Sequence, residues 1–499
     1  MNNNLVIGLD SSTTSTKAIV FDKNGKIYAK ASSPIPQFSP QLNYYEQNPE
    51  DWWKSAKIVI SKITKQIDPN RIKALSIVNQ RETFVPLDKN QKPLRSAIIW
   101  LDERCKSEVE QFANLIGKNK IHNITGKPID YAPVVYRLAW MKKYEKDLYK
   151  KIAMICDVQA WLVWKLTGEF KTSWASADPL GLFDMKKKKW SNDILGHLEL
   201  NENQLPLLYP TGKCLGKISK EAAKSTCLKT ETKLIAGGGD GQAAGLGSNA
   251  ISSERAYLNL GTAAVAGIYG KQYKTNNAFR TMSACNDNGY YYECSLRAGT
   301  FAIDWFIKNI LIVNASQEPK IYKQLENEAK KVPLGSDELL FLPYLNGVMN
   351  PYWDSNARSV FLGLSSFHTR GHMYRSILEG IAFEQLFAIE EVENFTGKKV
   401  KQLAAIGGGA NSIFWCKIIA DITNKDVIIL KNSEASCLGA GISAAVGLGL
   451  HSSFKSAADK MNSVKKTITP DQSNHKKYKK MFARYKNIYP SIQKVFQLS

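Results

Sequence analysis

Apolar and polar positions alternate along this chain in a pattern that predicts strands and helices in turn. Leu5 to Leu9 is mostly apolar, Ser11 to Thr16 is a run of six hydroxyl residues, and Ala18 to Phe21 is apolar again before the turn sequence DKNG. This pattern predicts a β-hairpin with a polar turn. Later strand-like runs such as KALSIV and TKLIAGGGD are separated by helical stretches, for example at 49–66. The alternation favours an α/β fold.

The second half of the chain repeats the design of the N-terminus. After the short polar segment SNAISSE at 248–254, the sequence AYLNLGTAAVAGIYGKQ at 256–272 is again an apolar strand, a Gly/Thr turn and a second strand. A chain of 499 residues is also too long for one hydrophobic core. We therefore predict a duplicated fold, with an N-terminal domain at 1–247 and a C-terminal domain at 248–499.

A third glycine-rich turn lies near the C-terminus. VKQLAAIGGGANSIFWCKIIADI at 400–422 has the pattern of a strand, a triple-glycine turn and an amphipathic helix. Glycines at such a joint let a ligand approach the backbone and leave free N–H groups facing it. SEASCLGAGISAAVGLGL at 433–450 follows as a helix of small residues that is suited to close packing. Each feature also has a purely structural explanation, since glycine is common where a strand joins a helix.

Composition and charge exclude several classes of function. The net charge is +22, but the lysines are dispersed and no nucleic-acid motif accompanies them, so we do not expect nucleic-acid binding. No apolar run approaches the roughly 18 to 20 residues that a membrane span needs, and the N-terminus lacks a signal-peptide pattern, so we predict a cytoplasmic protein without membrane contact. The eight cysteines are scattered without CxxC pairs, which favours a reduced compartment over disulfides or zinc.

Asp240 ends an apolar strand after three glycines, in the sequence AGGGDGQAAG. An aspartate in this position can cap the helix that follows. It can also face a ligand and accept a proton from an attacking hydroxyl, which is the one chemical task that phosphoryl transfer leaves to a carboxylate. The residue alone does not distinguish the two roles.

The ordered set of turns resembles the FGGY family of carbohydrate kinases over nearly the whole chain. The set comprises 10–17, Asp240, 261–262 and 407–411. The most specific stretch is SVFLGLSSFHTRGHMYRSILEG, which fits the C-terminal signature of the family with Gly363, His372, Ser376 and Glu379 in place. The resemblance implies the duplicated ribonuclease H-like ATPase fold of actin, hexokinase and the 70-kDa chaperones, in which two α/β domains enclose a central cleft.

The resemblance also implies ATP and Mg²⁺ as cofactors and assigns residues to them. Asp240 would be the catalytic base, and Asp10 and Asp240 would hold Mg²⁺, which keeps much of its hydration shell. The residues implied in ATP binding are Thr13, Thr14, Lys17, Gly261, Thr262, Gly408, Gly409 and Asn411.

The substrate signals are mixed. NQRETFVPLD, together with Trp100, is similar to the glycerol kinase pattern, in which Arg81 and Glu82 form a polyol clamp because a guanidinium donates to hydroxyls and a carboxylate accepts from them. WLDERC is similar to the Trp, Asp and Arg spacing of xylulokinases, which adds Asp102. The substrate-binding residues that we predict are Gln80, Arg81, Glu82, Trp100, Asp102 and Asp240.

Departures from the glycerol kinase pattern shift the prediction towards a sugar. The N-terminal signature of the family carries an aromatic residue and a lysine where this chain has Ala132 and Arg137, and Gly241 stands where glycerol kinases have a substrate-binding glutamine. A smaller residue at 241 suggests room for a bulkier sugar. We expect a kinase for a ketopentose such as xylulose, with glycerol or erythritol as the alternative and an actin-like or chaperone-like ATPase as the alternative of a different class. The partner is a small sugar or polyol; a homodimer is compatible with the family, and the sequence does not determine the oligomeric state.

Overall fold

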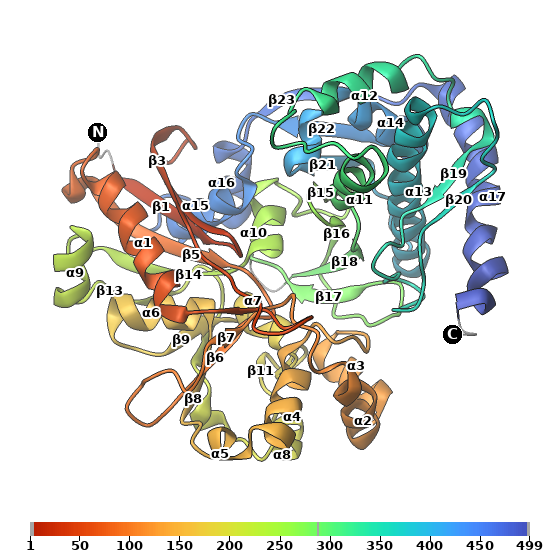
Figure 1. Cartoon of the computed structure of the whole chain (residues 1–499). Helices are drawn as coiled ribbons and strands as arrows, with labels where there is room; N and C mark the ends of the chain where they lie inside the picture. The colour runs from red at the N-terminus through yellow and green to blue at the C-terminus, as the bar shows by residue number, and fades with distance from the viewer. Residues whose placement is uncertain (1–3, 287–288, 497–499) are drawn as a thin grey trace.

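Two mixed β-sheets form the framework of the protein, and each is built from one half of the chain (Figure 1). The computed structural model describes residues 4–286 and 289–496. In spatial order the first sheet consists of β13 (Cys214–Lys217), β14 (Lys233–Gly239), β5 (Ile72–Asn79), β1 (Leu5–Ser11), β2 (Ser15–Phe21) and β3 (Ile27–Pro34). The second consists of β17 (Arg280–Ser283), β18 (Tyr290–Leu296), β16 (Ala264–Gly270), β15 (Arg255–Leu260), β21 (Gln402–Ile406), β22 (Asp426–Leu430) and β23 (Val464–Ile468).

The two sheets share one topology. In each, the first strand pairs antiparallel with the second and parallel with a later strand, as β1 does with β2 and β5 and as β15 does with β16 and β21. Another parallel strand follows on the same side, β14 in the first sheet and β22 in the second. This repeat confirms the predicted duplicated α/β fold.

Helices cover the outer face of each sheet. In the first half these are α1 (Pro49–Thr64), α6 (Val158–Thr167) and α9 (Lys220–Thr226); in the second they are α13 (Arg370–Thr396) and α14 (Ile413–Thr423), with α17 (Gln472–Phe496) packed on α14. The sequence of α1 explains its position. Asn48 caps the helix by accepting a hydrogen bond from the Glu50 backbone N–H, Pro49 opens it, and its buried residues recur at helical spacing towards the sheet.

The remaining elements form insertions and edges. In the first half they are β4 (Glu46–Gln47), β6 (Phe84–Leu87), β7 (Ala97–Ile98), β8 (Met154–Asp157), α2 (Lys106–Ile116), α3 (Lys118–Thr125), α4 (Val134–Tyr144), α5 (Lys146–Tyr149), β9 (Lys171–Ser173), α7 (Trp174–Ala177), β10 (Phe183–Asp184), β11 (Lys189–Trp190), α8 (Asn192–His197) and β12 (Leu207–Tyr209). In the second half they are α11 (Thr300–Trp305), α12 (Ile321–Ala329), β19 (Leu340–Leu342) and β20 (Val360–Leu362). β4, β7, β6 and β8 form a small sheet beside the first large one.

Three helices lie between the two large sheets: α10 (Asp240–Gly247), α15 (Ala435–Gly447) and α16 (Phe454–Met461) (Figure 1). α15 comes from the second half of the chain, yet its Cys437 and Leu438 pack in one cluster with Val6 and Ile19 of the first sheet. α10 comes from the first half, and its Ala244 packs with the second sheet. Each half therefore supplies a helix that packs on the other half's sheet, and α10 also contacts its own sheet through Ala243 and Leu246.

Glycines bring the backbones of these elements into contact. A Cβ on Gly439 of α15 would lie 2.0 Å from the carbonyl oxygen of Ala243 in α10, and a Cβ on Gly247 would lie 1.9 Å from the carbonyl oxygen of Ala435. Likewise, a Cβ on Gly8 of β1 would lie 2.0 Å from the carbonyl oxygen of Cys437 in α15. Atoms cannot approach so closely, so these positions require glycine, and the predicted close packing of the small-residue helix is confirmed.

Within 4–286 and 289–496, no helix is both long enough and apolar enough to cross a membrane. All eight cysteines are free, and six of them are buried.

We predict that Gly439→Ala lowers the free energy of unfolding by about 1–3 kcal/mol, because the added methyl forces α15 away from α10. Chemical denaturation of the purified variant measures this change. Gly196→Ala is the matched control, since a Cβ on Gly196 meets nothing within 4 Å, and its effect should stay below about 1 kcal/mol. Equal stability of the two variants would contradict the backbone contact.

Candidate active site

A cavity of about 250 Å³ lies between the two halves, where the N-termini of α10 and α15 meet the two large sheets. It contains carboxylates, cations and exposed backbone from both halves. Its lining residues are Asp10, Lys17, Arg81, Asp240, Gly241, Ala244, Tyr257, Asn259, Val265, Ile406, Gly407, Ser433, Glu434, Ala435 and Ser436. Residues from three of the predicted turns therefore meet in one cleft.

Asp240 is the first residue of α10, and its side chain is 37% exposed to the cleft. One carboxylate oxygen accepts a hydrogen bond from the Gly241 N–H at 2.7 Å and lies 3.3 Å from Nε of Arg81. The hydroxyl of Ser436 donates to its carbonyl oxygen at 3.2 Å, which ties α10 to α15. The enclosing cleft raises the pKa of the carboxyl, and the Arg81 guanidinium opposes that shift. One carboxylate oxygen of Asp240 is therefore held by these contacts, and the other faces the cleft.

The three glycines before Asp240 serve close packing. A Cβ on Gly237 would lie 2.0 Å from the carbonyl oxygen of Ile77, one on Gly238 would lie 2.4 Å from the sulfur of Cys285, and one on Gly239 would lie 2.7 Å from the Arg81 side chain. All three are buried at the end of β14. The triple glycine allows three neighbours to approach this strand, and one of them is the arginine that contacts Asp240.

Asp10 lies on the first hairpin, where it pairs with Lys17 across β1 and β2. Its side chain is almost completely buried, and its Oδ1 atom has no hydrogen-bond partner among the described residues. Burial and the nearby charge of Asp240 raise the pKa of Asp10 to about 8. A buried oxygen without a partner, beside a second carboxylate, is suited to a cation.

The hydroxyl residues of the first hairpin have different surroundings. Ser12 donates to the Ser15 carbonyl oxygen and so caps its own turn. Thr13 accepts a hydrogen bond from Nε1 of Trp100 at 2.9 Å, whereas Thr14 is exposed. Of these three residues, only Ser12 caps the turn with its hydroxyl. The exposed Thr14 is therefore accessible to a ligand.

Lys17, which the resemblance places on phosphate, forms an ion pair with Glu434 at the start of α15. Nζ donates to both carboxylate oxygens, at 2.8 and 3.0 Å. Because the two side chains come from different halves, this pair crosses the cleft. An incoming phosphate must compete with Glu434 for the lysine.

Arg81 and Glu82, the predicted polyol clamp, lie together beside Asp240, and both face charges from the second half. Arg81 donates to Glu293 at 2.9 Å, and Glu82 accepts from Arg280 at 3.0 Å. A Cβ on Gly241 would lie 3.1 Å from the Arg81 guanidinium. The space that the missing side chain leaves at 241 is therefore filled by Arg81, and the expected extra room for a larger sugar is not present there.

Gln80 and Asp102 do not reach the cleft. Gln80 is buried and donates to the side chain of Gln47. Asp102 is fully buried, and its carboxylate accepts hydrogen bonds from the Tyr45 N–H and from three N–H groups of Arg104. Both side chains stabilise the walls of the site, and the geometry leaves Asp102 without an open acceptor for the sugar contact predicted from its sequence.

Arg137 forms hydrogen bonds with the backbone of three residues of the predicted sugar site. It is fully buried in α4, and its guanidinium donates to the carbonyl oxygens of Glu82 at 2.8 Å, Trp100 at 3.1 Å and Asp102 at 3.4 Å. The backbone of Glu82 has a φ of +46°, a left-handed conformation that is unfavourable for a glutamate. Arg137, first noted as a departure from the family pattern, is therefore what anchors the clamp to the wall of the site.

None of the predicted nucleotide residues of the second half lines this cavity, although Gly407, next to three of them, does. Gly407 lines the cavity itself, and a Cβ on Gly408 would meet no atom within 4 Å. In contrast, Gly409 packs against the ring of Trp415. Gly261 and Thr262 form the turn between β15 and β16 that we expected, and Asn411 is exposed.

The signature stretch at 359–380 lies in the outer layer of the second half. Glu379 on α13 accepts hydrogen bonds from Arg375 and Tyr478, and His372 caps the same helix together with Thr369. This stretch identifies the fold without supplying a group to the cleft.

Sequence reasoning missed Tyr257, Asn259 and Glu434, which line the cleft. It also missed Arg280 and Glu293, which form ion pairs with the predicted clamp. One signal was available for Glu293, which is a single acidic residue inside the otherwise uncharged strand YYYECSL. A charge in a strand that is buried on both faces needs a partner. The sequence does not show which partner that is.

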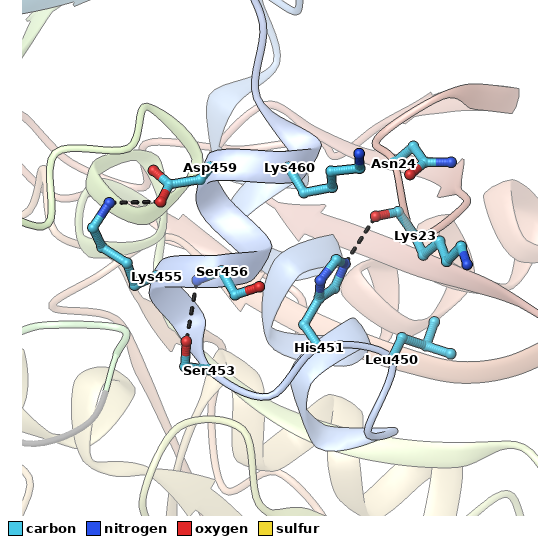
Figure 2. A pocket seen from close by; sticks show the side chains of 9 residues that line it. All are labelled: Lys23, Asn24, Leu450, His451, Ser453, Lys455, Ser456, Asp459 and Lys460. Atoms are coloured by element: carbon cyan, nitrogen blue, oxygen red, sulfur yellow. Dashed lines mark hydrogen bonds and ion pairs between the residues drawn. The ribbon is translucent and has the colours of Figure 1, made fainter.

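A second hollow, of about 650 Å³, lies on the outside of α16 (Figure 2). There Nε2 of His451 lies 2.8 Å from the carbonyl oxygen of Lys23, and Lys455 pairs with Asp459. None of the predicted site residues lines it. The chemistry predicted from the sequence therefore belongs to the cleft between the sheets.

Comparison with known proteins places the chain among carbohydrate kinases. The N-terminal domain of the FGGY family of carbohydrate kinases matches residues 5–247, and the C-terminal domain of that family matches 256–448. The chain is 31% identical to a xylulose kinase of Bacillus subtilis (strain 168) over 490 residues, which is 97% of this chain and 96% of that protein. It is 27% identical to a gluconokinase of the same strain, over 97% of this chain and 95% of that protein. The structure resembles the ligand-bound xylulose kinase from Lactobacillus acidophilus with a TM-score of 0.92 and 27% identity, covering 99% of this chain and all of that one.

We predict that Arg137→Met lowers the free energy of unfolding by about 3 kcal/mol or more, because three buried carbonyl oxygens lose their donor. Urea denaturation provides the measurement. Arg484→Met is the control, since Arg484 is exposed and its ion pair with Glu338 lies at the surface, where a change of less than about 1 kcal/mol is expected. A loss at Arg137 no larger than that at Arg484 would rule out the anchoring role.

Proposed function

The chain belongs to the FGGY family of carbohydrate kinases, and on that basis we propose that it transfers the γ-phosphate of ATP to the terminal hydroxyl of xylulose. The observation that carries the choice of sugar is the full-length similarity to proteins named xylulose kinase, which reaches 31% identity. The arrangement of Arg81, Glu82 and Asp240 at the cleft supports it, because these three side chains offer donors and acceptors to neighbouring hydroxyls.

The charge of the cleft favours a neutral sugar over a sugar acid. Arg81 and Arg280 contribute two positive charges, while Glu82, Glu293 and Asp240 contribute three negative ones. The two arginines are already paired with carboxylates. A substrate carboxylate, such as that of gluconate, would therefore meet a site without a free cation among these five groups, whereas the hydroxyls of xylulose carry no charge.

The proposed reaction uses Asp240 as the base. The terminal hydroxyl of the sugar gives its proton to the Asp240 carboxylate while its oxygen forms a bond to the γ-phosphorus. The bond between that phosphorus and the β–γ bridging oxygen breaks, and ADP leaves with the electron pair. Arg81, at 3.3 Å from Asp240, orients the carboxylate towards the cleft. The two halves exclude water, so that ATP is not hydrolysed instead.

Asp10 and Asp240 fit a magnesium ion in this proposal. The free, buried Oδ1 of Asp10 is a hard oxygen donor, and such donors are those that Mg²⁺ prefers. No cluster of three or more His, Cys, Asp or Glu that could hold a metal is found among the described residues, so water and phosphate oxygens would complete the shell. The ion would neutralise charge on the transferred phosphate.

We predict that Asp240→Ala reduces kcat by at least about a hundredfold, because the sugar hydroxyl loses its base, while the affinity for MgATP is largely kept. A coupled ADP-release assay and nucleotide titration provide the two numbers. Asp459→Ala, in the outer hollow, is the control and should match the parent chain in both. A near-normal rate in Asp240→Ala would exclude the assigned base.

We also predict that, among xylulose, ribulose, gluconate, glycerol and erythritol, xylulose gives the highest kcat/KM. The assay measures ADP release from MgATP with each compound and without any. A preference for glycerol or erythritol would show that the Arg81, Glu82 and Trp100 group selects a polyol. Turnover that does not depend on any compound would instead indicate an ATPase.

A further inference from the structure

Four charged side chains are linked by ion pairs between the two halves, and the peptide bond that joins Arg81 to Glu82 closes them into a ring. Arg81 and Glu82 come from the first half, and Arg280 and Glu293 come from the second. Arg81 donates to both oxygens of Glu293, at 2.9 and 3.1 Å, and Nε of Arg280 donates to Glu293 at 2.6 Å. Arg280 also donates to Glu82 at 3.0 Å. We call these four residues the charge ring.

The second half holds its part of the charge ring rigidly. Arg280 and Glu293 face each other on neighbouring strands, β17 and β18. The side chain of Glu293 has no exposed surface, and it accepts a further hydrogen bond from the hydroxyl of Tyr257 at 2.6 Å. Burial alone would raise the pKa of Glu293, but Arg280, Arg81 and Tyr257 lower it to about 2. Glu293 is therefore a fixed negative charge pointing at the first half.

Within the described residues, the first half offers Arg81 and Glu82 one ion-pair partner of its own. Arg81 forms a further ion pair with Asp240, and the ion pair that Glu82 forms among the described residues is the one with Arg280. Arg137 donates to the backbone carbonyl oxygen of Glu82 and so does not position its carboxylate. When the two halves separate, Arg81 can turn fully onto Asp240, and Glu82 loses its ion pair with Arg280. The geometry of the clamp therefore depends on the position of the second half.

We propose that Glu293 and Arg280 are positioning residues for the sugar site, which hold Arg81 and Glu82 in their sugar-binding geometry only when the two halves are closed. The proposal rests on the proposed function, since it takes Arg81 and Glu82 as the sugar clamp. It assigns to the second half a part in sugar recognition, a task that the sequence placed in the first half alone. Sugar affinity and closure of the cleft are coupled through these contacts.

A kinetic test separates positioning from general stabilisation. Glu293→Gln keeps the shape and removes the charge, and we expect it to raise the KM for the sugar at least about tenfold while the KM for ATP stays within about twofold. Tyr257→Phe removes a single hydrogen bond to Glu293 and should give a smaller rise in the same direction. This milder variant keeps the proposal testable if Glu293→Gln folds poorly.

Glu384→Gln is the matched control. Glu384 is also a buried glutamate of the second half, and it accepts hydrogen bonds from Tyr344 and Tyr485 away from the cleft. This variant should leave both KM values unchanged. An unchanged sugar KM in both Glu293→Gln and Tyr257→Phe would overturn the proposal, and so would a parallel rise of the sugar and ATP KM values.

Hydrogen exchange tests the charge ring without any sugar. In the sugar-free protein, amides at 79–83, which carry Arg81 and Glu82, should exchange at least several-fold faster in Glu293→Gln than in the parent, and at the parent rate in Glu384→Gln. Unaltered exchange in Glu293→Gln would overturn the proposal. If exchange at 79–83 increases in Glu293→Gln but the parent phosphorylates none of the five sugars and polyols tested above, the proposed function is wrong. The effect of the charge ring on the segment 79–83 would still be confirmed.

Discussion

The contact between the backbones of α10 and α15 is the constraint on which the rest of the structure depends. Each helix belongs to one half of the chain and covers the sheet of the other, so that the two halves cannot be packed separately. Gly247 and Gly439 let the helices touch, since a Cβ at either position would overlap the opposing backbone. Glycine in a helix costs about 1 kcal/mol relative to alanine. The close packing between two apolar sheets offsets that cost, because it buries both inner faces at once.

The same two helices bring the chemical groups to the cleft. Asp240 is the first residue of α10, and Glu434 immediately precedes α15, so both carboxylates lie at helix N-termini that meet between the sheets. The hydroxyl of Ser436 joins these two ends directly. A helix N-terminus also carries partial positive charge, which favours phosphate. The packing that holds the halves together therefore also places Asp240, the proposed base, beside two helix N-termini that favour anions.

The sequence predicted what depends on local patterns and missed what depends on long-range pairing. The hairpin at 5–21, its repeat at 256–272 and the position of Asp240 at the end of a strand follow from short runs of residue types. The contact between Arg81 and Glu293 joins positions 212 residues apart, and no local pattern contains it. The sequence also did not show which polar side chains would be buried. Asp102 has the spacing of a sugar ligand, but Arg104, two residues later, occupies its carboxylate inside the wall.

Gly241 shows how one residue type can have two physical meanings. On the sequence alone, glycine in place of a glutamine suggests an enlarged sugar pocket. In the structure, the guanidinium of Arg81 lies only 3.1 Å from the place that a Cβ at 241 would take, and its ion pair with Glu293 of the second half holds it there. A larger residue at 241 would push Arg81 away from both Asp240 and Glu293. The space beside residue 241 is therefore determined by where the arginine is held.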